Sequence, residues 1–94
     1  MYKLAISTSG EYVSAAIFEE KLLASFVSKT NKGSTGILLN QINELFDKTK
    51  ASRNDLNALY LDVGPGYYTG LRIGLSVSQG LGAVLGIPII PVNG

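Results

Sequence analysis

Short apolar runs alternate with polar turns over the first thirty residues of the chain. The runs cover residues 3–7, 12–18 and 22–28 and are rich in β-branched, aromatic and other apolar side chains. The polar segments between them, residues 8–10 and 19–21, have the length of tight hairpin turns. This pattern predicts three strands joined as consecutive antiparallel hairpins.

Helical periodicity replaces this alternation from about residue 34 to residue 48. The apolar side chains that fall within one arc of a helical projection are Leu38, Leu39, Ile42, Leu45 and Phe46. Only Ile37 lies off this stripe, and Ser34 or Thr35 is the candidate N-cap after a polar loop over residues 29–33. The segment is therefore predicted to be an amphipathic helix that lies on a sheet.

A nearly continuous apolar run over residues 58–63 is typical of a central strand that is buried on both faces. A glycine-rich corner then leads into a second helix over about residues 69–85, where Gly86 is a candidate left-handed cap before Pro88. Residues 87–92 form the last predicted strand. The order β-β-β-α-β-α-β predicts one α/β domain over residues 1–94, with a mixed five-stranded sheet to which two crossovers add parallel strands.

The second helical segment is apolar on two sides. One side has Leu71, Gly74, Leu75, Ser78, Leu81, Gly82 and Leu85. The nearly opposite side has Ile73, Val77, Gly80 and Val84. A helix with two apolar sides should be buried on both. One side can cover the sheet, so the other should meet the first helix or a molecule outside the chain.

Three glycines lie inside this helix, and each costs about 1 kcal/mol relative to alanine. Small residues recur every four positions and form a shallow groove at Gly70, Gly74, Ser78 and Gly82. Two interpretations stay open. The groove serves packing of the helix on its own sheet, or it belongs to a subunit interface. The candidate interface residues are Leu71, Gly74, Leu75, Ser78, Gly82 and Leu85.

The glycine-rich corner joins a buried strand directly to a helix start, where unpaired N–H groups meet the positive end of the helix dipole. Such a corner can bind an anion or a nucleotide. The candidate nucleotide-binding residues are Thr8, Gly64, Gly66, Thr69 and Gly70. Alternatively, the corner only lets two backbones pack closely. Asp62 precedes the glycines, and we expect its carboxylate to accept hydrogen bonds from loop N–H groups rather than to bind a metal.

Composition limits the chemistry that this sequence can support. The chain has 46% hydrophobic and 16% charged residues, a formal net charge of +1, and neither cysteine nor histidine. A disulfide framework, a thiolate nucleophile and an imidazole base are therefore excluded, and we predict no catalytic residue and no metal ligand. The basic residues are scattered, which disfavours direct nucleic-acid binding. No signal peptide or membrane span is evident, so a cytoplasmic location is expected.

The glycine-rich motif and the N-terminus resemble the TsaB (YeaZ) family. Residues 64–74, Gly-Pro-Gly-Tyr-Tyr-Thr-Gly-Leu-Arg-Ile-Gly, are similar to the family's Gly-Pro-Gly-Ser-Phe-Thr-Gly-Leu-Arg-Ile-Gly, and residues 4–9 to its Leu-Ala-Ile-Asp-Thr-Ser. The resemblance covers the whole chain and corresponds to the first half of a two-domain protein. It implies an actin-like ATPase domain with a ribonuclease H-like sheet. Ser7 stands where the family has an aspartate, which argues against a metal–nucleotide site.

The resemblance implies a non-catalytic partner subunit in the synthesis of threonylcarbamoyladenosine in tRNA. Such a subunit pairs through its first two helices with TsaD, the catalytic paralogue, or with itself as a homodimer. A separate ATPase, TsaE, joins that assembly, and tRNA is reached only through the complex. No cofactor is required on this reading. Two alternatives stay open: an actin-like nucleotide hydrolase or phosphotransferase that binds ATP or ADP, and a degenerate self-associating module.

Overall fold

The computed structural model describes residues 2–8, 12–29, 35–64 and 68–93, with the backbone alone at residues 35 and 68–70. The elements are the strands β1 (Tyr2–Ser7), β2 (Tyr12–Phe18), β3 (Leu22–Lys29), β4 (Leu56–Asp62) and β5 (Ile89–Val92), and the helices α1 (Thr35–Thr49), η1 (Arg53–Asp55) and α2 (Tyr68–Leu85). The predicted element order is confirmed. Only the short 3₁₀-helix η1 was not predicted.

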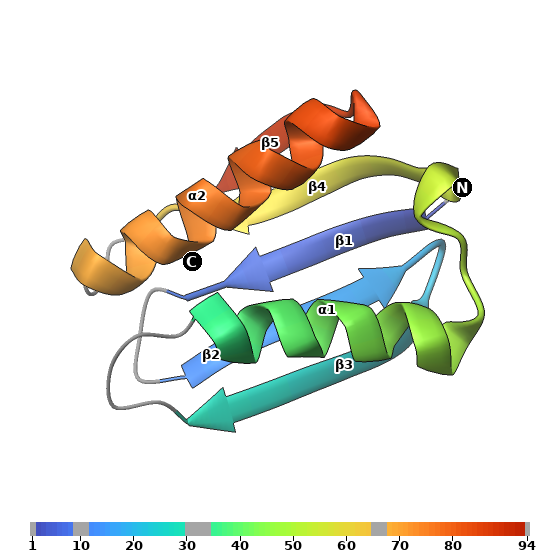
Figure 1. The fold of residues 1–94 in the computed structure, drawn as a ribbon, viewed down its shortest axis with the longest axis horizontal. Coiled ribbons are helices and arrows are strands. Elements are labelled where there is room, and N and C mark those ends of the chain that lie inside the picture. Colours follow the sequence, from blue (N-terminus) through green and yellow to red (C-terminus); the bar gives the residue numbers. More distant parts are fainter. Residues whose placement is uncertain (1, 9–11, 30–34, 65–67, 94) are drawn as a thin grey trace.

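The strands form one mixed sheet in the order β3-β2-β1-β4-β5 (Figure 1). β1 pairs antiparallel with β2, and β2 pairs antiparallel with β3, as expected for hairpins. β4 lies parallel to both β1 and β5, so the helices between these strands act as crossover connections. The sheet is therefore the mixed five-stranded sheet that the sequence predicts.

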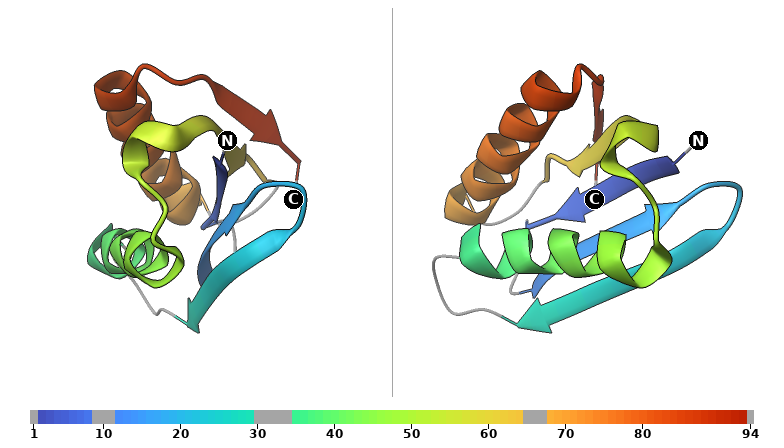
Figure 2. Two further views of the ribbon diagram at one scale, coloured as in Figure 1. Left: turned by 90° about the vertical axis from the view of Figure 1, so that its right-hand side faces the viewer. Right: turned by 45° about the vertical axis from the view of Figure 1, so that its right-hand side comes forward.

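Both long helices cover the same face of the sheet (Figure 2). The hydrophobic core lies between the helices and that face. Its buried residues are Leu4, Ile6, Val13, Ala15, Ile17, Leu38, Ile42, Leu45, Phe46, Leu56, Leu59 and Leu61. Because side chains alternate between the two faces of a strand, every second residue of β1 and β2 contributes to this core.

The core-facing stripe of α1 differs from the predicted one at two positions. Leu39 is 44% exposed, whereas Gln41, which the projection placed outside the stripe, is buried. The Gln41 amide reaches the sheet, where Nε2 donates a hydrogen bond of 3.0 Å to the Val13 carbonyl. α1 begins at Thr35, and the alternative N-cap Ser34 lies outside the described residues.

The opposite face of the sheet has no covering helix among the described elements, and we call it the open face (Figure 2). Small side chains occupy its centre at Ala5, Ser14, Ala16 and Ser25. The rings of Phe18 and Tyr60 lie 5.7 Å apart. The prediction that residues 58–63 are covered on both faces is therefore wrong, because only the face toward the helices meets a second layer.

The end of α2 confirms the predicted cap. Gly86 has a φ of 67°, and its N–H donates to the Gly82 carbonyl over 2.8 Å. The Ile87 N–H donates to the same carbonyl over 3.1 Å. β5 begins at Ile89, two residues after the predicted start. Among the described residues, no helix has the length and apolarity that crossing a membrane requires.

Candidate functional site

The site predicted from the glycine-rich corner lies where β1 and β4 end. These two strands are parallel neighbours, so their carboxyl ends meet at one edge of the sheet. Ligands in such sheets bind outside the carboxyl ends of the strands. Ser7 ends the first strand and Thr8 follows it, Asp62 ends the second, and α2 begins at Tyr68 after the corner. The topology thus brings together the residues that the sequence placed there.

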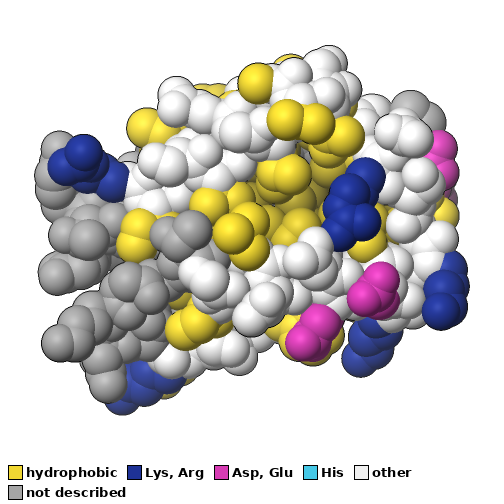
Figure 3. All heavy atoms as spheres, in the orientation of Figure 1, with side chains coloured by type: hydrophobic (Ala, Val, Ile, Leu, Met, Phe, Trp, Pro, Cys, Tyr) yellow, Lys and Arg dark blue, Asp and Glu magenta, His cyan; other side chains and the backbone are white. Residues whose placement is uncertain are grey.

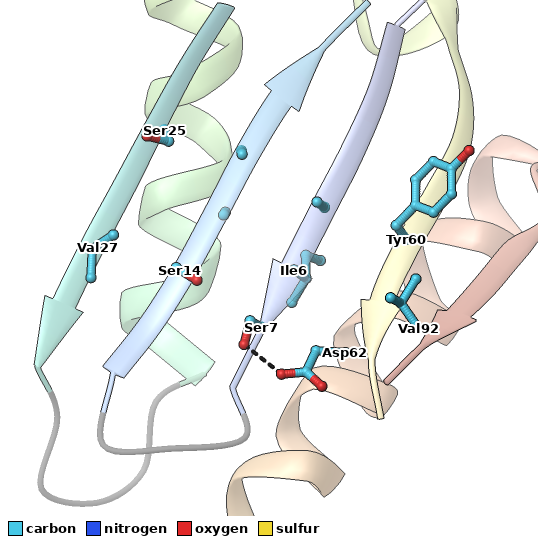
Figure 4. Close-up of a pocket in the computed structure, with 11 residues that line it drawn as sticks. Ile6, Ser7, Ser14, Ser25, Val27, Tyr60, Asp62 and Val92 are labelled. Atoms are coloured by element: carbon cyan, nitrogen blue, oxygen red, sulfur yellow. Dashed lines mark hydrogen bonds between the residues drawn. The ribbon is translucent and has the colours of Figure 1, made fainter. Parts of the chain in front are cut away.

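The carboxylate of Asp62 is held by its own chain on both oxygens. Oδ2 accepts a hydrogen bond of 2.8 Å from Ser7 Oγ, across the two parallel strands (Figure 4). Oδ1 accepts a hydrogen bond of 2.9 Å from the Gly64 N–H. The prediction that this carboxylate binds loop N–H groups is confirmed. Asp62 therefore ties the end of β4 to the end of β1 and fixes the first turn of the corner.

Gly64 adopts a φ of 101°, a conformation that residues with a side chain rarely adopt. The glycine is thus required by the turn itself, whatever the corner binds. Gly66 lies outside the described residues. Thr69 and Gly70 lie in the first turn of α2, of which the structure describes the backbone. Their part in nucleotide binding stays a prediction.

Thr8 lies beneath α2 rather than in an open pocket. Its side chain is 1% exposed, and a Cβ built on Gly74 would lie only 2.5 Å from Thr8 Oγ1. The absence of a side chain at position 74 therefore lets the helix approach the end of β1. This contact belongs to helix–sheet packing, and Thr8 would have to leave it to reach a phosphate.

Half of the predicted interface residues of α2 face the chain's own sheet. Gly74, Ser78 and Gly82 are buried, and a Cβ on Gly82 would lie 3.3 Å from the Ile87 carbonyl and from the Ile89 side chain. These three positions are corrected: they serve packing within the domain, because the groove of small residues receives the sheet. Leu71, Leu75 and Leu85 are half-buried or exposed and stay predicted interface residues.

Apolar side chains gather between α1 and α2 on the outer surface of the helical layer (Figure 3). The exposed large apolar residues of the two helices are Leu39, Leu75 and Val84, of which Val84 is 83% exposed. Leu75 and Val84 lie nearly opposite each other on α2, and Leu75 lines a hollow beside Leu61 and Arg72. We therefore call only Leu39 and Val84 the helix-face patch. Val84 belongs to the second apolar side of the helix. The predicted interface residues were all taken from the first side, so the prediction missed Val84.

A hollow of about 460 Å³ lies on the open face. Its lining includes Ser7, Ser14, Ser25, Tyr60, Asp62 and Val92 (Figure 4). The Ser7–Asp62 hydrogen bond forms its polar end, and the rest of the lining consists mainly of small or apolar side chains. The hollow exists because small residues occupy the centre of the open face.

A family model described as "TsaD: tRNA N6-adenosine threonylcarbamoyltransferase" matches residues 21–94. The chain belongs to the TsaD family. Among curated relatives, proteins named "tRNA threonylcarbamoyladenosine biosynthesis protein TsaB" are similar to it. The Buchnera aphidicola (Schizaphis graminum) protein is 33% identical and covers 96% of the chain, and the Escherichia coli protein is 31% identical with the same coverage.

The solved structure "YeaZ from Pseudomonas aeruginosa" is 31% identical, superposes with a TM-score of 0.89 and covers 98% of this TsaD-family chain. The Thermus thermophilus RuvC structure superposes with a TM-score of 0.63 at 14% identity, so it supports the fold alone. The resemblance to TsaB (YeaZ) and the ribonuclease H-like fold are thus confirmed. The chain spans 43%, 39% and 42% of the lengths of the Buchnera, Escherichia and Pseudomonas proteins.

Proposed function

We propose that this chain is a non-catalytic partner in the synthesis of threonylcarbamoyladenosine in tRNA. The names of its curated TsaB relatives support that pathway. The single observation that supports a structural rather than catalytic role is the hydrogen bonding of the Asp62 carboxylate. Both of its carboxylate oxygens accept hydrogen bonds from the chain's own Ser7 and Gly64, so the acidic group at the strand ends stabilises the corner.

The proposed contact surface is the helix-face patch. Its partner is a TsaD-type catalytic paralogue, and a protein of the same family would offer a similar helical layer for a pseudo-twofold contact. Exposed apolar side chains such as Val84 favour burial against a partner. A homodimer would use the same patch when the chain is alone. We also propose that a TsaE-type ATPase joins the assembly and that tRNA is bound only by the complex. The chain would act in the cytoplasm, without contact with a membrane.

The test combines binding with product formation. The chain is mixed with a purified TsaD-type paralogue and followed by sedimentation, and threonylcarbamoyladenosine in tRNA is measured by mass spectrometry. Val84→Lys should raise the dissociation constant for the paralogue by about tenfold, because it places a charged side chain in the apolar contact between the two proteins. Val92→Lys is the matched control, since Val92 is 45% exposed and lines the open face instead.

Three results would count against the proposal. Equal affinity of the Val84→Lys and parent chains for the paralogue would remove the helix-face patch as the contact. Formation of the modified nucleoside by this chain without the paralogue would remove the non-catalytic role. Self-association without any affinity for the paralogue would favour the degenerate self-associating module.

A nucleotide hydrolase or phosphotransferase is the second candidate function. The observation that favours it is the position of the first turn of α2 at the carboxyl ends of β1 and β4, where helix N–H groups can face phosphates. Calorimetric titration with ATP and magnesium tests this candidate directly. Heat that saturates with nucleotide would support it, and no heat at millimolar nucleotide would exclude it.

A further inference from the structure

The two edges of the sheet differ in how they are protected. β5 is four residues long and contains Pro91, which has no N–H to offer to a further strand. Short strands and prolines are devices that block pairing at an edge. β3, at the other edge, has eight residues and no proline. One edge is therefore blocked, whereas the other is open to strand addition.

Apolar side chains are concentrated at the open edge. Val27, Leu22 and Leu23 are 64%, 62% and 38% exposed, and all three belong to β3. A charged side chain within an edge strand would discourage pairing, but within β3 the charge is confined to the last residue, Lys29. Both the backbone and the side chains of this strand thus favour a partner.

The charges at the two ends of β3 identify that partner. Glu19, Glu20 and Lys21 precede the strand and sum to a net charge of −1, whereas Lys29 ends it with a charge of +1. Antiparallel pairing of β3 with the same strand of a second copy sets each negative end beside a positive end. Parallel pairing would set like charges together. The strand is thus complementary to itself in the antiparallel direction.

We propose that β3 pairs antiparallel with β3 of a second copy of this chain and extends the sheet across a twofold axis. The pairing uses the edge opposite β5, and it does not involve the helix-face patch, so it goes beyond the proposed function. Because a twofold axis perpendicular to the sheet preserves its faces, the helices of both copies lie on one side. The two open faces then form one continuous surface.

The first test compares two single lysine variants by sedimentation equilibrium of the full chain. Val27→Lys should raise the dissociation constant by about tenfold, because each copy contributes one apolar cross-strand contact that becomes charged. Val84→Lys, in the helix-face patch, should weaken only a homodimer that forms through the helices, and it should leave the β3 pairing, followed by amide hydrogen exchange along residues 22–29, unchanged. Circular dichroism and thermal unfolding establish that both variants are folded.

The second test checks the direction of pairing by exchanging charges. Glu20→Lys and Lys29→Glu should each weaken the dimer by about fivefold, since one favourable contact is lost on each side of the axis. The double variant Glu20→Lys/Lys29→Glu should restore the parent affinity. In the parent, amide hydrogen exchange along residues 22–29 should slow as the protein concentration rises.

Each other outcome overturns the inference. A chain that stays monomeric at millimolar concentration excludes the pairing. Self-association that is lost in Val84→Lys but kept in Val27→Lys shifts the contact to the helices, and this result would leave the proposed function intact. Failure of the double charge exchange to restore affinity excludes the antiparallel arrangement.

Discussion

Gly74 is the position where the packing of α2 on the sheet can be tested most sharply. A Cβ at this position would lie 2.5 Å from Thr8 Oγ1 and 3.2 Å from Leu61 Cδ1. Both neighbours are buried, with exposed fractions of 1% and 2%, so neither can move into solvent. In Gly74→Ala, either the helix or the end of β1 must shift.

The magnitude follows from two opposing effects. Overpacking of a core costs about 1–3 kcal/mol, whereas alanine in place of glycine inside a helix gains about 1 kcal/mol. We expect Gly74→Ala to lower the free energy of unfolding by about 1 kcal/mol, which corresponds to a decrease in Tm of about 4–8 °C for a domain of this size.

Gly80→Ala is the matched control on the same helix. Apart from its chain neighbours and the backbone of its own helix, no atom lies within 4 Å of the Cβ position at Gly80, so only the helix-propensity gain of about 1 kcal/mol applies. The two variants should therefore shift stability in opposite directions in urea unfolding followed by circular dichroism. Thr8→Ala in the Gly74→Ala background should recover part of the loss, because the clashing oxygen is gone. Equal stability of Gly74→Ala and Gly80→Ala would refute the packing argument.

Three further substitutions test other contacts by urea unfolding. Ser7→Asp, the family residue, should destabilise the fold by about 1–3 kcal/mol at neutral pH because it faces the Asp62 carboxylate; a loss that neither magnesium nor acid reduces would contradict charge repulsion as the cause. Ser78→Ala should stabilise by about 1 kcal/mol, since the buried Ser78 Oγ has no hydrogen-bond partner. Lys50→Gly should stabilise by about 1 kcal/mol because Lys50 has a φ of 61°; Lys48→Gly, inside α1, should destabilise instead.

The element order could be predicted because strand and helix periods are distinct along this chain. The cap at Gly86 was also predictable, since glycine favours the positive φ of 67° found there. Boundaries were less certain: β4 begins at Leu56, two residues before the predicted start. η1 was missed because its residues are polar and show no hydrophobic periodicity. Its N-cap is a hydrogen bond from the Asn54 N–H to Ser52 Oγ, which a hydrophobic pattern does not reveal.

The open face and the inward groove of α2 could not be predicted from pattern alone. Alanine and serine at positions such as Ala16 and Ser25 have neither the size of core residues nor the polarity of surface residues. Helical projection showed that α2 has two apolar sides, but it could not say which side meets the sheet. That choice depends on the close approach of Gly74 to Thr8, a contact between distant parts of the sequence.

The position of β1 between an antiparallel and a parallel neighbour has a consequence for how the chain folds. Its pairing with β2 joins close positions such as Ser7 and Ser14, whereas its pairing with β4 joins Leu4 to Leu59. Closing the longer loop loses more chain entropy, and this loss comes before the stabilising contacts form. We expect the meander of β1, β2 and β3 to form early and the segment from β4 to β5 to dock last, so the corner at Asp62 is completed only at the end of folding.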